Sequence, residues 1–173
     1  LGGLTSDAMA DVHPLQELIA RYVDEHFVAK VAAGYRAGRL LLLGTTNMDA
    51  QRPVMWSMGA LAASGHPDSV RLFRDIMLAS ASIPGVFPPV MFEVEASDGG
   101  KYDEMHCDGG VSTQVFLYPA AFSFRDLPGE AAAKRTRHLY VIRNAKLSPT
   151  HEPIKRKILT ITERAIATLI KTQ

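Results

Sequence analysis

Apolar residues recur at intervals of three and four along much of this chain of 173 residues. Because that spacing places apolar side chains on one face of an α-helix, it predicts helices over residues 14–23, 24–37, 69–83 and 154–170. Residues that start or stop helices stand at several of the predicted ends. Pro14 suits a first helical turn, Asp24 can cap the second helix, and Gly38 and Pro84 are helix stops.

Other stretches have the alternation or the continuous apolar run of β-strands. Residues 40–45 form an apolar run that is typical of a buried strand. Further strands are expected at 53–58, 90–96, 101–107 and 138–143. Phe92 and Val94 alternate with Met91 and Glu93, so the two sets should face opposite sides of a sheet. Helices and strands interleave, which indicates an α/β fold, and the hairpins favour a mixed sheet.

Composition and charge leave an ordinary globular chain. Apolar residues make up 47% and charged residues 21% of the sequence. The formal net charge is +1, so charge gives no reason to expect nucleic acid as a partner. The one cysteine, Cys107, excludes an intrachain disulfide and a zinc site built from several cysteines. No apolar run has the length of a membrane span.

The two ends of the chain bear on domain organisation. The sequence begins at Leu1, not at a methionine, and ends at Gln173 directly after a helical pattern. We therefore expect residues 1–173 to belong to one domain and to be an internal fragment of a longer protein. The length is enough for a domain with a hydrophobic core.

The most suggestive short stretch is Asp108-Gly109-Gly110, which follows the predicted strand 101–107. Strand ends that lead into flexible turns are common places for chemistry in α/β proteins. Two glycines permit a positive φ and let the backbone approach another group closely. The alternative is a plain surface turn, which we expect for the similar stretch Asp98-Gly99-Gly100.

The stretch before Asp108 gives it a context. Residues 79–89 have the pattern A-S-x-x-x-P-x-x-F-P-P, and a strand separates them from the D-G-G of 108–110. In this order the two segments resemble the patatin-like phospholipase family, and 41–49 and 139–144 extend the resemblance. It implies a three-layer α/β/α fold with a mixed sheet, of which residues 1–173 are the incomplete C-terminal portion. The three prolines of the loop should fix its geometry beside Asp108.

The resemblance also implies an activity, namely hydrolysis of acyl esters of phospholipids or other lipids by a Ser-Asp dyad. Asp108 takes the role of the general base, and Gly109 and Gly110 shape its loop. Partial burial would raise the pKa of this carboxyl toward that of a useful base. The family needs no organic cofactor, and we expect no metal at the site. The expected partner is a lipid substrate, reached through transient contact with a lipid surface.

The nucleophile that such a dyad needs is missing from the sequence. A serine nucleophile in this kind of hydrolase belongs to G-x-S-x-G at a strand-to-helix turn, and no serine of the chain has those neighbours. The glycine-rich loop that would hold the oxyanion is also absent. We expect both upstream of Leu1 and expect residues 1–173 alone to be inactive. Ser80 and Ser82 are better explained as small residues that close a helix before Pro84.

Three other interpretations stay open at this point. His106 and Cys107 could serve a different hydrolase, although neighbours on a strand point to opposite faces. His106 and Asp108, with Asp103 and Glu104, could bind a metal, which needs three or four converging ligands. A patatin-like fold could also serve as a non-catalytic binding or scaffold module. A further set of polar residues after the first strand either lines the same cleft or caps a turn: Thr45, Thr46, Asn47 and Asp49.

Overall fold

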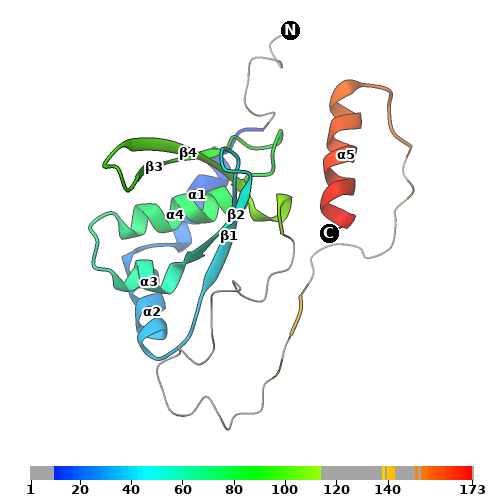
Figure 1. Cartoon of the computed structure of the whole chain (residues 1–173). Coiled ribbons are helices and arrows are strands. Elements are labelled where there is room, and N and C mark those ends of the chain that lie inside the picture. The colour runs from blue at the N-terminus through cyan, green and yellow to red at the C-terminus, as the bar shows by residue number, and fades with distance from the viewer. Residues whose placement is uncertain (1–9, 114–137, 139, 143–150, 152, 173) are drawn as a thin grey trace. The chain divides into compact units, whose positions relative to one another are not determined.

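The computed structural model describes residues 10–113, 138, 140–142, 151 and 153–172. The chain divides into two compact units, Leu1–Val115 and Phe116–Gln173, and each is described by itself. A single domain over residues 1–173 stays a prediction. The first unit contains every described strand and the residues around Asp108 (Figure 1).

The first unit has four described α-helices: α1 (His13–Tyr22), α2 (Glu25–Arg36), α3 (Met58–Ala63) and α4 (Ser69–Ser80). The predicted caps are confirmed for α2, since Asp24 Oδ1 accepts a hydrogen bond from Phe27 N at 2.7 Å. Gly38 then follows the helix with a φ of +81°. The short α3 was not predicted. It begins after Ser57, whose hydroxyl accepts a hydrogen bond from Ala60 N at 3.4 Å.

The four described strands form one sheet: β1 (Leu42–Asn47), β2 (Arg52–Ser57), β3 (Val90–Glu95) and β4 (Lys101–Asp108). Their order in the sheet is β2-β1-β4-β3, and each described pairing is antiparallel. The predicted hairpin of β3 and β4 is confirmed, with Gly99 in its turn at a φ of +80°. Helices together with this sheet confirm the α/β class.

The core lies between the sheet and α4, which contacts β1, β3 and β4 (Figure 1). Phe73, Ile76 and Ala79 of α4 are buried in one cluster with Phe92 of β3. The predicted alternation in β3 is confirmed, because Phe92 is 6% exposed whereas its neighbour Met91 is 50% exposed. The same packing orients the end of β4, which leads to Asp108.

The interpretation of β1 as a buried apolar run needs correction. Leu40 and Leu41 are 37% and 40% exposed, whereas Thr45, Thr46 and Asn47 are buried. The reason is that β4 pairs with β1 only at Thr45, Thr46 and Asn47, the last residues of β1. The polar half of β1 therefore lies inside the molecule, where its hydroxyl groups find hydrogen-bond partners.

The second unit contains one described helix, α5 (Ile158–Thr172). The helix predicted over 154–170 is confirmed, although it begins four residues later than expected. The strand predicted over 138–143 is wrong for its described residues, which lie outside any strand, with Ile142 at 93% exposure. None of the described strands pairs with these residues. None of the described helices has both the length and the apolar character to cross a membrane.

Candidate active site

Asp108 is the last residue of β4, where three segments of the chain meet. It lies opposite Thr45 of β1 in the sheet register. Its backbone N–H donates a hydrogen bond to the carbonyl oxygen of Ser82 at 2.9 Å. Ser82 belongs to the segment that follows α4, so this bond joins the end of β4 to the predicted proline loop. The loop therefore reaches the aspartate through Ser82 itself.

The side chain of Asp108 begins a short 3-10 turn, η2 (Gly109–Val111). Its Oδ1 accepts a hydrogen bond from the backbone N–H of Gly110 at 2.7 Å. Its Oδ2 has no hydrogen bond with the residues that the structure describes. Burial raises the pKa of the Asp108 carboxyl, and the bond from Gly110 opposes that shift. The site thus holds a half-buried carboxylate with one oxygen fixed by the backbone.

The two glycines have a role, but only one of the two predicted reasons holds. Neither Gly109 nor Gly110 has a positive φ. Close approach is the reason that the structure supports. A Cβ on Gly109 would lie 2.5 Å from the carbonyl oxygen of Gly44 in β1. A Cβ on Gly110 would lie 3.1 Å from Oδ1 of Asp108. Side chains here would push the turn away from β1 or press on the carboxylate.

Hydroxyl groups from distant segments hold this turn in place. Thr46 Oγ1 donates to the backbone carbonyl of Asp108 at 3.0 Å and lies 2.8 Å from Ser112 Oγ. Ser80 Oγ donates to the carbonyl of Gly44 at 2.9 Å, beside the position that Gly109 occupies. Sequence reasoning did not assign these contacts. The available signal was the run of two threonines at the end of a strand, where apolar residues are usual.

The hydroxyl groups of Ser80 and Ser82 both donate hydrogen bonds to backbone carbonyl oxygens. Ser82 is fully buried, and its hydroxyl donates to the carbonyl of Leu78 at 2.9 Å. In the part of the chain that the structure describes, no serine hydroxyl forms a hydrogen bond with the Asp108 carboxylate. The geometry thus agrees with the interpretation of these serines as small residues that close α4.

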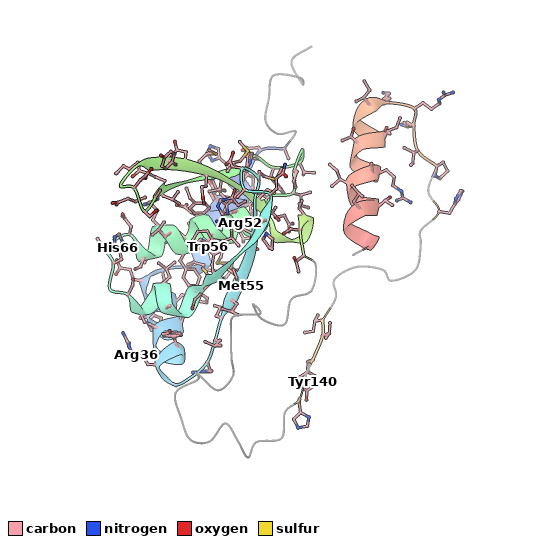
Figure 2. The ribbon with its side chains drawn as sticks, in the orientation of Figure 1. Arg36, Arg52, Met55, Trp56, His66 and Tyr140 are labelled. Atoms are coloured by element: carbon pink, nitrogen blue, oxygen red, sulfur yellow. The ribbon has the colours of Figure 1, made fainter. Side chains whose placement is uncertain are left out.

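His106 lies two residues before Asp108, on the same face of β4, and within an aromatic cluster. Its side chain is 1% exposed. The rings of Trp56 and Phe92 have centroids 5.6 Å and 5.1 Å from its imidazole, and Figure 2 labels Trp56. Trp56 Nε1 donates to Thr45 Oγ1 at 2.8 Å, and the same oxygen lies 2.8 Å from His106 Nδ1.

These contacts engage both nitrogens of the imidazole. Thr45 Oγ1, which accepts a hydrogen bond from Trp56, can either donate its own hydrogen to His106 Nδ1 or accept a second hydrogen bond from it. His106 Nε2 faces Glu104 Oε2 at 3.4 Å. Both ring nitrogens are thereby occupied within the protein. This arrangement gives His106 a packing role and disfavours the interpretation in which it activates a nucleophile.

Cys107 points to the other side of the strand and is 2% exposed. Burial, with the nearby Asp108 carboxylate, raises the pKa of its thiol to about 11. A thiol of that pKa is almost entirely protonated near neutral pH, whereas thiol hydrolases need the thiolate. The structure therefore disfavours Cys107 as a nucleophile.

The remaining polar candidates serve the turn between β1 and β2. Asn47 Oδ1 accepts a hydrogen bond from Ala50 N at 2.8 Å. Asp49 Oδ2 accepts one from Met105 N at 2.7 Å, which ties this turn to β4. These bonds favour the capped-turn interpretation over a cleft lining. Among the described residues, no three side chains of histidine, cysteine, aspartate or glutamate converge on a possible metal position.

Asp108 therefore lies on a glycine turn at a strand end of an α/β unit, which is a common place for chemistry in such folds. The family comparison is more specific. The model of the family described as patatin-like phospholipase matches residues 1–121, so the chain belongs to that family. The resemblance noted from the sequence is thereby confirmed. Members of this family are generally hydrolases that act on lipids. No curated protein matches the chain.

Proposed function

We propose that Asp108 is the general base of a Ser-Asp dyad that hydrolyses lipid acyl esters. The observation that carries this proposal is the state of its carboxylate. One oxygen is held by Gly110 N–H at 2.7 Å, the other has no partner among described residues, and burial raises the pKa. A positioned, partly desolvated carboxylate can accept the proton of a serine hydroxyl as it attacks an ester carbonyl.

The serine would come from outside these 173 residues. No serine of the chain has the glycine neighbours of a nucleophile turn. The described serines near the turn, Ser80 and Ser82, bind backbone carbonyls. Gly109 allows the Asp108 turn to lie directly against β1, which holds the turn and its carboxylate in place. The substrate would be a phospholipid or another lipid ester, met at a lipid surface.

The proposal is tested on the full-length protein that contains this chain. A fluorophosphonate probe, which reacts with activated serine hydroxyls, should label one serine outside residues 1–173. The same protein should hydrolyse a chromogenic acyl ester. The variant Asp108→Asn should lose labelling and lower the rate by about 10²- to 10⁴-fold, the usual contribution of a positioned base.

Other results would overturn the proposal in distinct ways. Labelling of a serine within this chain would contradict the assigned origin of the nucleophile. Loss of hydrolysis in Cys107→Ala, with Asp108→Asn active, would favour a thiol enzyme. Absence of both labelling and hydrolysis would leave a non-catalytic binding or scaffold module as the function.

A further inference from the structure

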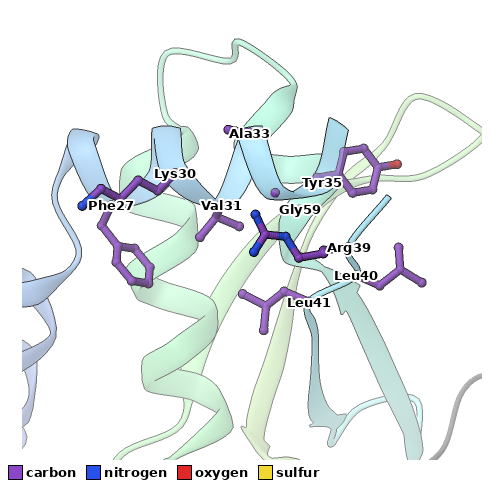
Figure 3. Close-up of a pocket in the computed structure, with 10 residues that line it drawn as sticks. Phe27, Lys30, Val31, Ala33, Tyr35, Arg39, Leu40, Leu41 and Gly59 are labelled. Atoms are coloured by element: carbon purple, nitrogen blue, oxygen red, sulfur yellow. The ribbon is translucent and has the colours of Figure 1, made fainter. Parts of the chain in front are cut away.

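A second feature of the first unit lies apart from Asp108. A cavity of about 620 Å³ opens beside α2, the segment that follows it, and the start of α3 (Figure 3). Its apolar lining includes Phe27, Val31, Leu40 and Leu41. Its volume is in the range of small-molecule sites, roughly 300–1,000 Å³. No residue of the Asp108 turn lines it, so the cavity is separate from the candidate active site.

The charged groups of this cavity have one sign. Lys30 and Arg39 line it, and no aspartate or glutamate does. Figure 3 shows the Arg39 guanidinium in the middle of the lining residues. Neither cation has a hydrogen bond or ion pair from its side chain to any residue that the structure describes. Exposed cations need no partner by themselves, but Lys30 and Arg39 line a cavity whose other lining residues are mostly apolar.

Two glycines give the cavity its form. A Cβ on Gly34 would lie 3.3 Å from Nε of Arg39, so a side chain there would displace the guanidinium. A Cβ on Gly59 would lie 2.6 Å from the ring of Tyr35. Gly59 thus lets α3 approach α2 closely. The C-terminal end of α2 also favours a nearby cation, which helps to hold Arg39 in this place.

We propose that this cavity binds a fatty acid. The Arg39 guanidinium would pair with the carboxylate, a geometry that allows two parallel hydrogen bonds. The alkyl chain would lie over Val31, Leu40 and Leu41, and Lys30 would add a second positive charge. This inference stands without the proposed reaction, although ester hydrolysis by this protein would release a molecule of that chemistry.

The test uses the full-length protein and decanoate below its micelle concentration, with the dissociation constant measured by titration calorimetry. Arg39→Gln should weaken decanoate binding about tenfold or more, since it removes a charge-assisted pair. Arg36→Gln is the matched control, because Arg36 is an exposed cation at the end of the same helix that does not line the cavity. Asp108→Asn should also leave this affinity unchanged, even if it abolishes hydrolysis.

Two comparisons and one mapping experiment decide the outcome. Decanol should bind much more weakly than decanoate, and equal affinity would overturn the proposal. Decyl phosphate that binds far more tightly would contradict the carboxylate and indicate a phosphorylated lipid. In the unaltered protein, a photoreactive fatty acid should crosslink within residues 27–41. Crosslinks confined to other segments would overturn the site even if Arg39→Gln failed to fold.

Discussion

The chain contains the same tripeptide twice, as Asp98-Gly99-Gly100 and as Asp108-Gly109-Gly110, and the two copies share their local hydrogen bond. In the first, Gly100 N donates to Asp98 Oδ1 at 2.8 Å. In the second, Gly110 N donates to Asp108 Oδ1 at 2.7 Å. A short aspartate turn of this kind is what the residues themselves favour.

The surroundings of the two turns differ. Gly99 has a φ of +80° with open space around it, as a hairpin turn requires. Gly109 has no positive φ but lies against the backbone of Gly44. Asp98 is exposed, whereas burial raises the pKa of Asp108. The tripeptide determines the local hydrogen bond. Residues far along the chain determine whether the carboxylate is buried enough to act as a base.

The largest expected difference in stability concerns the first glycine of each turn. In Gly109→Ala the new methyl would meet backbone atoms of Gly44 that cannot move without opening the β1–β4 pairing. We expect a loss of up to about 3 kcal/mol in the free energy of unfolding. Gly99→Ala adds only left-handed backbone strain, roughly 1 kcal/mol. Urea unfolding of the full-length variants measures both, and equal losses would contradict the account of Gly109.

A smaller difference is expected for the hydroxyl groups at each turn. Thr46→Val leaves the Asp108 carbonyl without its 3.0 Å bond, at a cost of about 1 kcal/mol, and should also lower the rate of hydrolysis. Thr46→Ser keeps the hydroxyl and should be milder in both respects. Tyr102→Phe removes a 3.3 Å bond to Asp98 on the exposed turn. Its effect should be near zero, and a loss comparable to that of Thr46→Val would contradict the comparison.

The smallest difference concerns how stability depends on pH. Because the folded state raises the pKa of Asp108, it binds that proton more tightly than the unfolded chain does. The favourable contribution is therefore complete below the ordinary aspartate pKa of about 4 and is lost as pH rises through the folded value. Asp108→Asn does not titrate, so its stability relative to wild type should improve toward neutral pH. Thermal unfolding below about pH 4 and near neutral pH, with Asp98→Asn as control, tests the direction of this change in stability.

The sequence was a good guide wherever local chemistry decides the structure. Asp24 caps the start of α2 and Gly38 follows its end, as predicted, and Gly99 forms the expected hairpin turn. The alternation in β3 also holds, since Phe92 is buried and Met91 is not. Each of these features was predicted from a local pattern, namely a helix cap, a turn glycine or an alternation of residue types, which is why the sequence alone was sufficient.

The sequence was a poor guide where distant segments determine burial. The apolar start of β1 is exposed and its threonine end is buried, because β4 and the Asp108 turn cover only that end. Thr46 bonds to a residue 62 positions later, a contact that no local pattern predicts. For the same reason the candidate site was located by a motif, while the groups that hold it became visible only in the folded chain.

The comparison of the two turns is tested most directly by one measurement. The value of kcat/KM for a chromogenic acyl ester is determined for the full-length protein with Asp108→Asn and, separately, with Asp98→Asn. The account predicts a fall of about 10²- to 10⁴-fold for Asp108→Asn and no significant change for Asp98→Asn. Hydrolysis that is indifferent to Asp108, or equally sensitive to both aspartates, would contradict the assignment of Asp108 as the base.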